Sequence, residues 1–326
     1  MKKSLIALAV LAAAGAASAQ SSVTLSGSLA AGYNYSSAGV SKISRHGAAD
    51  NNITLRGSED LGGGLTAGFL INQRFKPDTG ANSNSAANSL GATLTSPFAQ
   101  NVKLSLASAT LGEVAVGRFN GPVDVMRGPV DIFNGADYSY FAAAAGDAAT
   151  RYNGTAQYTS PSFSGVKIAV AQAMKANTPG ATVGMTEGTV TYTNGPIYVG
   201  LGLTQNSGTA PGLPVDGKDV TTLVGAYDFT VAKVVGTYAK VDNPGATADT
   251  KRYNLGVQVP VAGNINLKAS YENFNTEAAT GDYKNTTIGA DYILSKRTKL
   301  IGDVYRKTND AANPKTGVFL GALHAF

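Results

Sequence analysis

Histidine and cysteine, the side chains most often used in catalysis and metal binding, are scarce, because the 326 residues contain two histidines and no cysteine. A general base must lie within hydrogen-bond reach of its nucleophile, and a zinc site needs several clustered nitrogen or sulfur ligands. His46, beside Arg45, is expected to be a solvated loop residue, with His324 at the opposite end of the fold. We therefore expect no catalytic residue, no metal site and no cofactor.

The charged side chains are the remaining reactive groups, and several alternate with apolar residues. The alternation is clear in three segments, 53–58, 65–74 and 102–106. Successive side chains of a strand point to opposite faces, so Arg56, Arg74 and Lys103 lie on the face away from the apolar residues. A cation on the lipid face at mid-bilayer costs about 2 to 4 kcal/mol. The pattern therefore predicts strands with one face in lipid and these cations in a water-filled lumen.

Segments of this kind recur along the whole chain, joined in turn by seven short links and eight longer polar ones. The longer links are 36–50, 76–100, 119–150, 174–186, 206–218, 242–250, 276–282 and 308–316. Fifteen links join 16 strands, and an even number closes an antiparallel barrel with its short turns in the periplasm and its longer loops outside. The predicted fold is therefore all-β, a 16-stranded antiparallel transmembrane β-barrel. Such a barrel is too wide for side chains to fill.

The two ends of the chain indicate where the barrel resides. Lys2 and Lys3 precede an apolar stretch and then Ala17-Ser18-Ala19, which predicts a signal peptide over 1–19 and a mature domain over 20–326. The last strand, 317–326, has one apolar face and ends on Phe326, which we expect to be part of the signal read by the barrel assembly machinery. Both features predict a multi-pass protein of an outer membrane.

Several other classes are disfavoured by composition. Cleavage lowers the formal net charge from +5 to +3, too little and too dispersed for nucleic acid binding. Beyond the signal peptide no stretch approaches the roughly 18 apolar residues of a transmembrane helix. A soluble all-β protein remains an alternative, as does a barrel that acts as a surface adhesin. Tyrosines near strand ends are expected to form the girdle at the membrane interface, namely Tyr33, Tyr158, Tyr192, Tyr227, Tyr292 and Tyr305.

Five motifs in order carry a resemblance that covers the whole mature chain. They are LRGSEDLGGG (55–64), VGR (116–118), SPSFSG (160–165), DYILSKRTKLIGDVY (291–305) and the terminal LHAF (323–326). With these motifs the chain resembles the general porins of Gram-negative bacteria, especially their β-proteobacterial members. The resemblance implies a homotrimer of 16-stranded barrels in outer-membrane lipid and lipopolysaccharide. Each pore would be narrowed by an inward-folded third loop and would pass small hydrophilic solutes and ions by diffusion.

The resemblance also assigns a constriction. Arg118 and Arg151 match two arginines of the barrel wall, although Asn52 stands where the family often has a third. Arg118 continues the lipid-facing phase of its strand, so an inward aim requires a bulge. On the loop the acids are Asp124, Asp131 and Asp137, which could instead only hydrogen-bond the loop backbone. Five wall cations against three acids predict a weak anion preference. A substrate-specific channel stays open as an alternative, but the sequence shows no aromatic track inside the lumen.

Overall fold

The fold is known from a computed structural model. It describes residues 21–37, 39–47, 51–83, 89–90, 100–140, 150–178, 181–209, 217–245, 247–278, 280–309 and 312–326. The expected signal peptide, 1–19, lies outside the described residues. No helix in the described part of the chain is long and apolar enough to cross a membrane.

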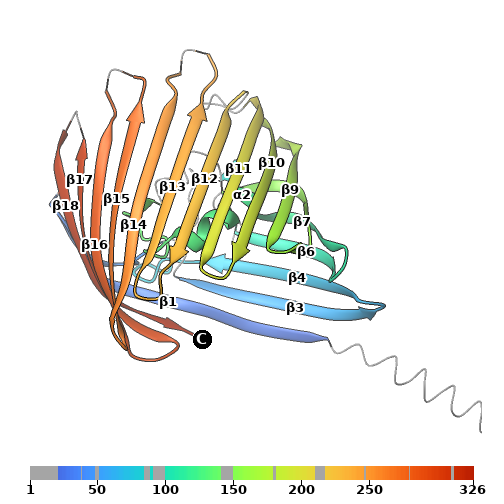
Figure 1. The fold of residues 1–326 in the computed structure, drawn as a ribbon, viewed down its shortest axis with the longest axis horizontal. Helices are drawn as coiled ribbons and strands as arrows, with labels where there is room; N and C mark the ends of the chain where they lie inside the picture. The colour runs from blue at the N-terminus through green and yellow to red at the C-terminus, as the bar shows by residue number, and fades with distance from the viewer. Residues whose placement is uncertain are drawn as a thin grey trace, which may run out of the picture.

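Almost all of the described chain is β-strand (Figure 1). The strands are β1 (Ser22–Ser36), β2 (Val40–Ser44), β3 (Asn52–Gly62), β4 (Leu65–Arg74), β5 (Ser89–Leu90), β6 (Asn101–Ser108), β7 (Gly112–Asn120), β8 (Arg151–Thr159), β9 (Val166–Thr178), β10 (Ala181–Asn194), β11 (Ile197–Thr209), β12 (Asp219–Asp228), β13 (Lys233–Asp242), β14 (Thr250–Ala262), β15 (Ile265–Thr276), β16 (Tyr283–Ile293), β17 (Thr298–Asn309) and β18 (Ala312–Ala325). Two short helices, α2 (Pro122–Arg127) and the 3-10 turn η2 (Gly128–Val130), follow β7.

The sheet closes on itself, because β1 pairs antiparallel with β18 on one side and with β2 and β3 on the other. β2 lies beside the second half of β1 and β3 beside its first half, so these two elements form one interrupted barrel strand. β5 is a two-residue piece that pairs parallel with β8. The 18 elements of the sheet therefore amount to 18 − 2 = 16 barrel strands, which confirms the predicted fold class.

The predicted alternation of faces is present along the strands. Apolar side chains of one phase are exposed on the outer surface, for example Leu25 at 62%, Leu104 at 61% and Leu255 at 64%. The other phase is polar, and its members bond to one another, as where Asn72 Nδ2 donates to Thr54 Oγ1 at 2.7 Å. A closed antiparallel sheet satisfies its backbone groups internally, which is the condition for crossing a bilayer.

Three of the predicted long links are wrong in part. The first of them, 36–50, contains β2, which pairs with β1. Strands β9 and β10 continue to Thr178 and from Ala181, so most of 174–186 is strand. Likewise β17 runs to Asn309 and β18 begins at Ala312, within the predicted link 308–316. The last two segments are rich in Thr and Asn and lack an apolar phase, but cross-strand backbone pairing outweighs their weak local preference for strand.

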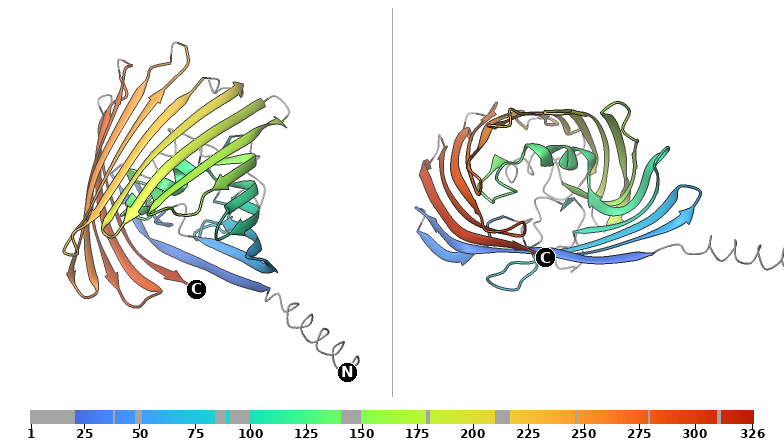
Figure 2. Two further views of the ribbon diagram at one scale, coloured as in Figure 1. Left: turned by 45° about the vertical axis from the view of Figure 1, so that its right-hand side comes forward. Right: turned by 60° about the horizontal axis from the view of Figure 1, so that its bottom comes forward.

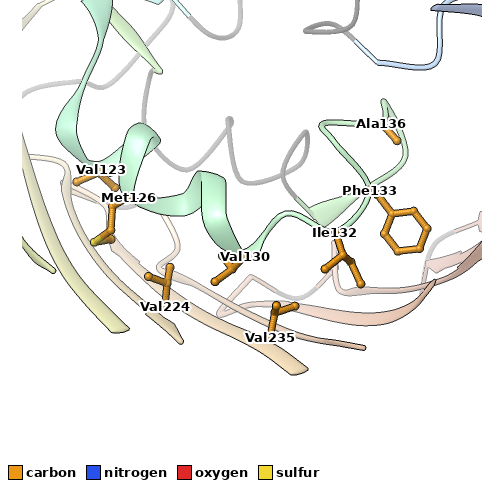
Figure 3. Close-up of a cluster of buried hydrophobic side chains, with 8 residues drawn as sticks. All are labelled: Val123, Met126, Val130, Ile132, Phe133, Ala136, Val224 and Val235. Carbon is orange, nitrogen blue, oxygen red and sulfur yellow. The ribbon is translucent and has the colours of Figure 1, made fainter. Parts of the chain in front are cut away.

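The third loop folds into the barrel, as predicted, and α2 and η2 lie inside the ring of strands (Figure 2). Its apolar side chains bury against the wall on the side of β11 to β14 (Figure 3). The cluster comprises Val123, Met126, Val130, Ile132, Phe133, Ala136, Val224 and Val235. A Cβ on Gly202 of β11 would lie 2.8 Å from both Met126 Cε and Val123 Cγ2. The absence of a side chain at this position therefore allows the helix to approach the wall closely.

Candidate functional site

A buried carboxylate of the wall holds the start of the third loop. Glu187 on β10 is 2% exposed and accepts hydrogen bonds from Val123 N at 3.2 Å and from Thr204 Oγ1 at 3.0 Å. The N-cap of α2 is Gly121, which has no side chain to satisfy the first amides of the helix. Glu187 takes over this role from another strand. This role of Glu187 could not be predicted from the sequence, because only the fold places this inward position of β10 beside the loop.

Loop and wall charges meet next to this anchor, at the ends of the strands that flank the loop. Asp124 of α2 is buried, accepts a hydrogen bond from Arg127 Nη2 at 3.1 Å and attracts Arg151 at the start of β8. Arg151 Nε donates to Asn101 Oδ1 at 3.0 Å. Arg118 and Arg151 lie close enough to repel each other. The structure thus brings together three of the predicted constriction residues.

Arg118 lies at the irregularity on which its predicted inward aim depends. The pairing of β7 with β8 shifts register between Gly117 and Phe119, and Gly117 has a φ of 137°, which favours glycine. Arg118 is half-buried, and its Nη1 donates to Asn153 Oδ1 at 2.7 Å, on the neighbouring strand. The bulge that the sequence argument required is present, while the aim of the guanidinium into the lumen stays a prediction.

The two other loop acids have different partners. Asp131 Oδ1 accepts a hydrogen bond from Phe133 N at 3.1 Å, the local turn contact that aspartate often makes. Asp137 forms an ion pair with Arg45, whose Nε lies 2.9 Å from the carboxylate. Arg45 belongs to the interruption between β2 and β3, where Gly47 also forms a β-bridge with Ala136. The loop tip is therefore fixed to the wall on the far side of its anchor.

The cations predicted on β3, β4 and β6 differ in how they are compensated. Lys103 Nζ forms an ion pair with Glu113 Oε1 at 2.5 Å. Arg56 is exposed and forms no ion pair with a residue that the structure describes, and Arg74 is half-buried at the end of β4. All three strands belong to the part of the wall along which α2 and η2 do not lie (Figure 2). Arg56 is thus a solvated charge on that open wall.

The expectation for His46 is wrong. Its side chain is buried, with Nε2 3.0 Å from Asp303 Oδ2, and its ring packs against Phe319 at 5.0 Å between centroids. Tyr138 of the loop also donates its hydroxyl to Asp303 Oδ2, at 2.6 Å. Polar neighbours in the sequence predicted that His46 would be exposed to solvent. In this barrel, however, the third loop covers part of the polar inner face, and His46 lies in that part. His46 therefore joins loop, wall and β17 and is not a loop residue in water.

Sequence reasoning also missed a network of charges behind the loop, on β14 to β17. Arg252 forms an ion pair with Glu272. Asp291 forms ion pairs with two lysines, because its Oδ1 lies 2.7 Å from Lys268 Nζ and its Oδ2 lies 2.9 Å from Lys299 Nζ. Phe133 of the loop covers Lys268, with its ring centroid 4.8 Å from Nζ. Each residue lies on the polar phase of its strand, a signal that was visible in the sequence. Their pairing depends on register and could not be predicted from it.

The arrangement suits transport better than reaction chemistry. No group of three or more His, Asp or Glu that could hold a metal is present within the described ranges. The buried carboxylates at the loop already hold the loop amides, His46 or the neighbouring cations. A closed barrel with an internal loop and a partly uncompensated basic wall instead provides a narrowed aqueous path with fixed charge.

Comparisons with known proteins agree with this geometry. The family described as Gram-negative porin matches residues 5–312. Outer membrane porin protein 32 of Delftia acidovorans is 35% identical, with 100% of this chain and 96% of the relative covered. An outer membrane porin protein of Bordetella pertussis is 29% identical over all of both chains. Among solved structures, the anion-selective porin from Comamonas acidovorans is similar with a TM-score of 0.80 and 30% identity, covering 94% of this chain and 100% of that one.

Proposed function

The chain belongs to the family of Gram-negative porins and forms an outer-membrane channel, and we propose that the basic wall makes this channel prefer anions. The observation that carries the proposal is the uneven compensation of charge around the loop. Carboxylates behind the loop are paired with Arg252, Lys268 and Lys299. On the open wall Arg56 has no carboxylate partner within the described residues.

The three loop acids add little negative charge to oppose that wall. Asp124 is buried beside Arg127 and Arg151, and Asp137 is neutralised by Arg45. The Asp131 carboxylate accepts a hydrogen bond from Phe133 N and so holds the turn of the loop. Fixed charge that faces water in a narrow pore concentrates counter-ions and repels ions of like charge. Small anions are therefore the favoured solutes, with neutral hydrophilic solutes passing by diffusion.

The expected partners extend this proposal. A homotrimer embedded in outer-membrane lipid and lipopolysaccharide fits the family and the exposed apolar phase of the strands. The terminal strand ends in Ala325, next to Phe326, which is 42% exposed and hydrogen-bonds through its backbone with Gly27 of β1. We propose that this side chain is read by the assembly machinery before β18 pairs with β1. The anion-selective solved relative supports the ion preference, and this chain's own charges supply its mechanism.

Reversal potential in a planar bilayer tests the preference. With a tenfold KCl gradient across wild-type protein, the sign of the potential is expected to show anion excess. The double variant R118S/R151S should shift the potential toward cation preference, because it removes two neighbouring positive charges, one of which, Arg151, attracts Asp124. The matched control is K284S/R306S, which removes two cations from the exposed outer phase of β16 and β17. A potential that is the same in wild type and R118S/R151S would contradict the assignment.

A further inference from the structure

A separate cavity of about 320 Å³ lies beside the tip of the third loop. It is near the ends of β15 to β18 that carry the longer connections between strands. Residues that line it include Ser139, Glu272, Asn285, Tyr305, Lys307 and Lys315. Asp137 of the predicted constriction also lines it, but the cavity differs in position from the cluster of Arg118, Arg151 and Asp124, because Lys307 is near the end of β17 and Lys315 near the start of β18. Solutes that enter from the long-link end would pass this cavity before the loop.

Two lysines lie side by side in the lining of this cavity. Lys307 and Lys315 are direct partners in the antiparallel register of β17 and β18, so their side chains leave the sheet on the same face. Like charges directly opposite one another destabilise a strand pair. Neither forms an ion pair within the described residues, and Lys307 Nζ lies over the ring of Tyr283, 3.6 Å from its centroid. An anion bound between the two ammonium groups would offset their repulsion.

The acids near the lysines are already compensated by other cations. Glu272 pairs with Arg252 through Oε1, which also accepts the Tyr283 hydroxyl at 2.9 Å. Asp137 pairs with Arg45 at 2.9 Å. The charge that remains at the cavity is therefore that of the two lysines, so the cavity favours a ligand with net negative charge.

Three residues that line the cavity each carry a buried polar atom with no hydrogen-bond partner among the described residues. These atoms are Ser139 Oγ, Glu272 Oε2 and Asn285 Oδ1. Ser139 is 3% exposed, Glu272 1% and Asn285 6%. Buried polar groups in native structures are nearly always hydrogen-bonded, so three together at one cavity indicate a polar ligand. A serine hydroxyl can donate, whereas the glutamate and asparagine oxygens accept only from a donor that the ligand brings.

An aromatic surface completes the cavity and corrects the expectation for Tyr305. This tyrosine does not belong to the interfacial girdle. It lines the cavity and stacks on Tyr138 with 4.6 Å between ring centroids. An aromatic face beside hydrogen-bonding groups suits the C–H groups of a carbohydrate chain, because the face offers apolar contact where no hydroxyl has to be satisfied.

We propose that this cavity binds a polyhydroxylated organic anion, a sugar acid of about gluconate size, before it reaches the loop. The carboxylate would lie between Lys307 and Lys315, and hydroxyl groups would donate to Glu272 Oε2 and Asn285 Oδ1 and accept from Ser139 Oγ. The proposal rests on the channel function and adds a solute class to it. Binding at this cavity would give the channel a preference among organic anions, which recordings with chloride as the only anion do not detect.

Three probes distinguish the contribution of charge to binding from that of hydroxyl groups in single-channel recordings in KCl. Each probe is added on the side of the membrane that faces the longer connections between strands. Gluconate carries both features, sorbitol carries the hydroxyl groups without charge, and propionate carries the charge without hydroxyl groups. Gluconate is expected to interrupt the KCl current in a saturable manner at concentrations at which sorbitol and propionate do not. Equal interruption by propionate would overturn the proposal, since it would show that charge alone is read.

Variants place the binding in the cavity. K307Q/K315Q should weaken gluconate binding by at least about tenfold, since it removes both positive charges that would bind the carboxylate. S139A should weaken it by a smaller factor, and K284Q, on the outer phase of β16, should leave it unchanged. Unchanged gluconate interruption in K307Q/K315Q would overturn the site. KCl steps in every variant show that it is folded, and loss of those steps in wild type would overturn the channel function instead.

Discussion

Arg56 provides a quantitative test of how the open wall acts on ions. The substitution Arg56→Gln removes one exposed charge with no carboxylate partner among the described residues. An ion that passes at about 6 Å in water interacts with that charge by about 0.7 kcal/mol, attractive for an anion and repulsive for a cation. With a Debye length of about 10 Å in 0.1 M salt, the difference between the two ions falls to roughly 0.8 kcal/mol, or about fourfold in their permeability ratio.

Salt dependence makes this prediction specific. In 1 M salt the Debye length is about 3 Å, and the same substitution should change the ratio by less than about 1.5-fold. The assay is the reversal potential at the same KCl gradient ratio around 0.1 M and around 1 M. The matched control is K103Q/E113Q, which removes both members of an ion pair on β6 and β7 and leaves the net charge unchanged. The reasoning fails if Arg56→Gln leaves the ratio unchanged at low salt, or if the control changes it as much.

Two further predictions concern the loop and its attachment. Gly202→Val should displace α2 from the wall, because the new side chain would meet Met126 and Val123, and the single-channel conductance should therefore change. In the control Gly225→Val no atom lies nearer than 4.0 Å to the added Cβ, so the conductance should stay the same. Equal conductances would mean that the loop does not depend on this contact. His46→Ala removes a hydrogen bond to buried Asp303 and should cost about 1 to 3 kcal/mol. Thermal unfolding followed by circular dichroism should show a lower midpoint than for the exposed His324→Ala, and equal midpoints would refute the structural role of His46.

The barrel was predictable because its signal is local. Period-two alternation such as that of 53–58 identifies both the strand and its lipid face, because the outer surface of a membrane barrel has to be apolar. Boundaries such as Thr178 and Asn309 were not predictable, since strands above the apolar band have no lipid face to mark them. The interruption between β2 and β3 also has no periodic signal, because it is defined by contacts of Arg45 and His46 with the distant loop and β17.

The site was predictable only in part, for a related reason. The alternation within their strands predicts that Lys103 and Lys268 lie on the polar face. The same alternation does not show whether such a charge is solvated or belongs to a buried ion pair. What separates them is the neighbour across the sheet and the presence of the loop. Glu113 lies one strand away from Lys103, and Phe133 of the loop covers Lys268. Glu187 is a further case, since its role as an anchor exists only after the loop has folded inward.

The position of the loop therefore decides which charges act on passing ions. Where loop residues cover the wall, charges such as Lys268 lose water, and a buried charge is tolerated only with a partner of opposite sign. Where the loop is absent, Arg56 keeps its water and needs no such partner. Burial thus requires compensation at Lys268. Under the proposed anion preference, the lumen receives its net positive field from the wall that the loop leaves open. A count of acids and bases along the sequence weighs every charge equally, although a charge that is paired with one of opposite sign adds little to the field that a passing ion meets.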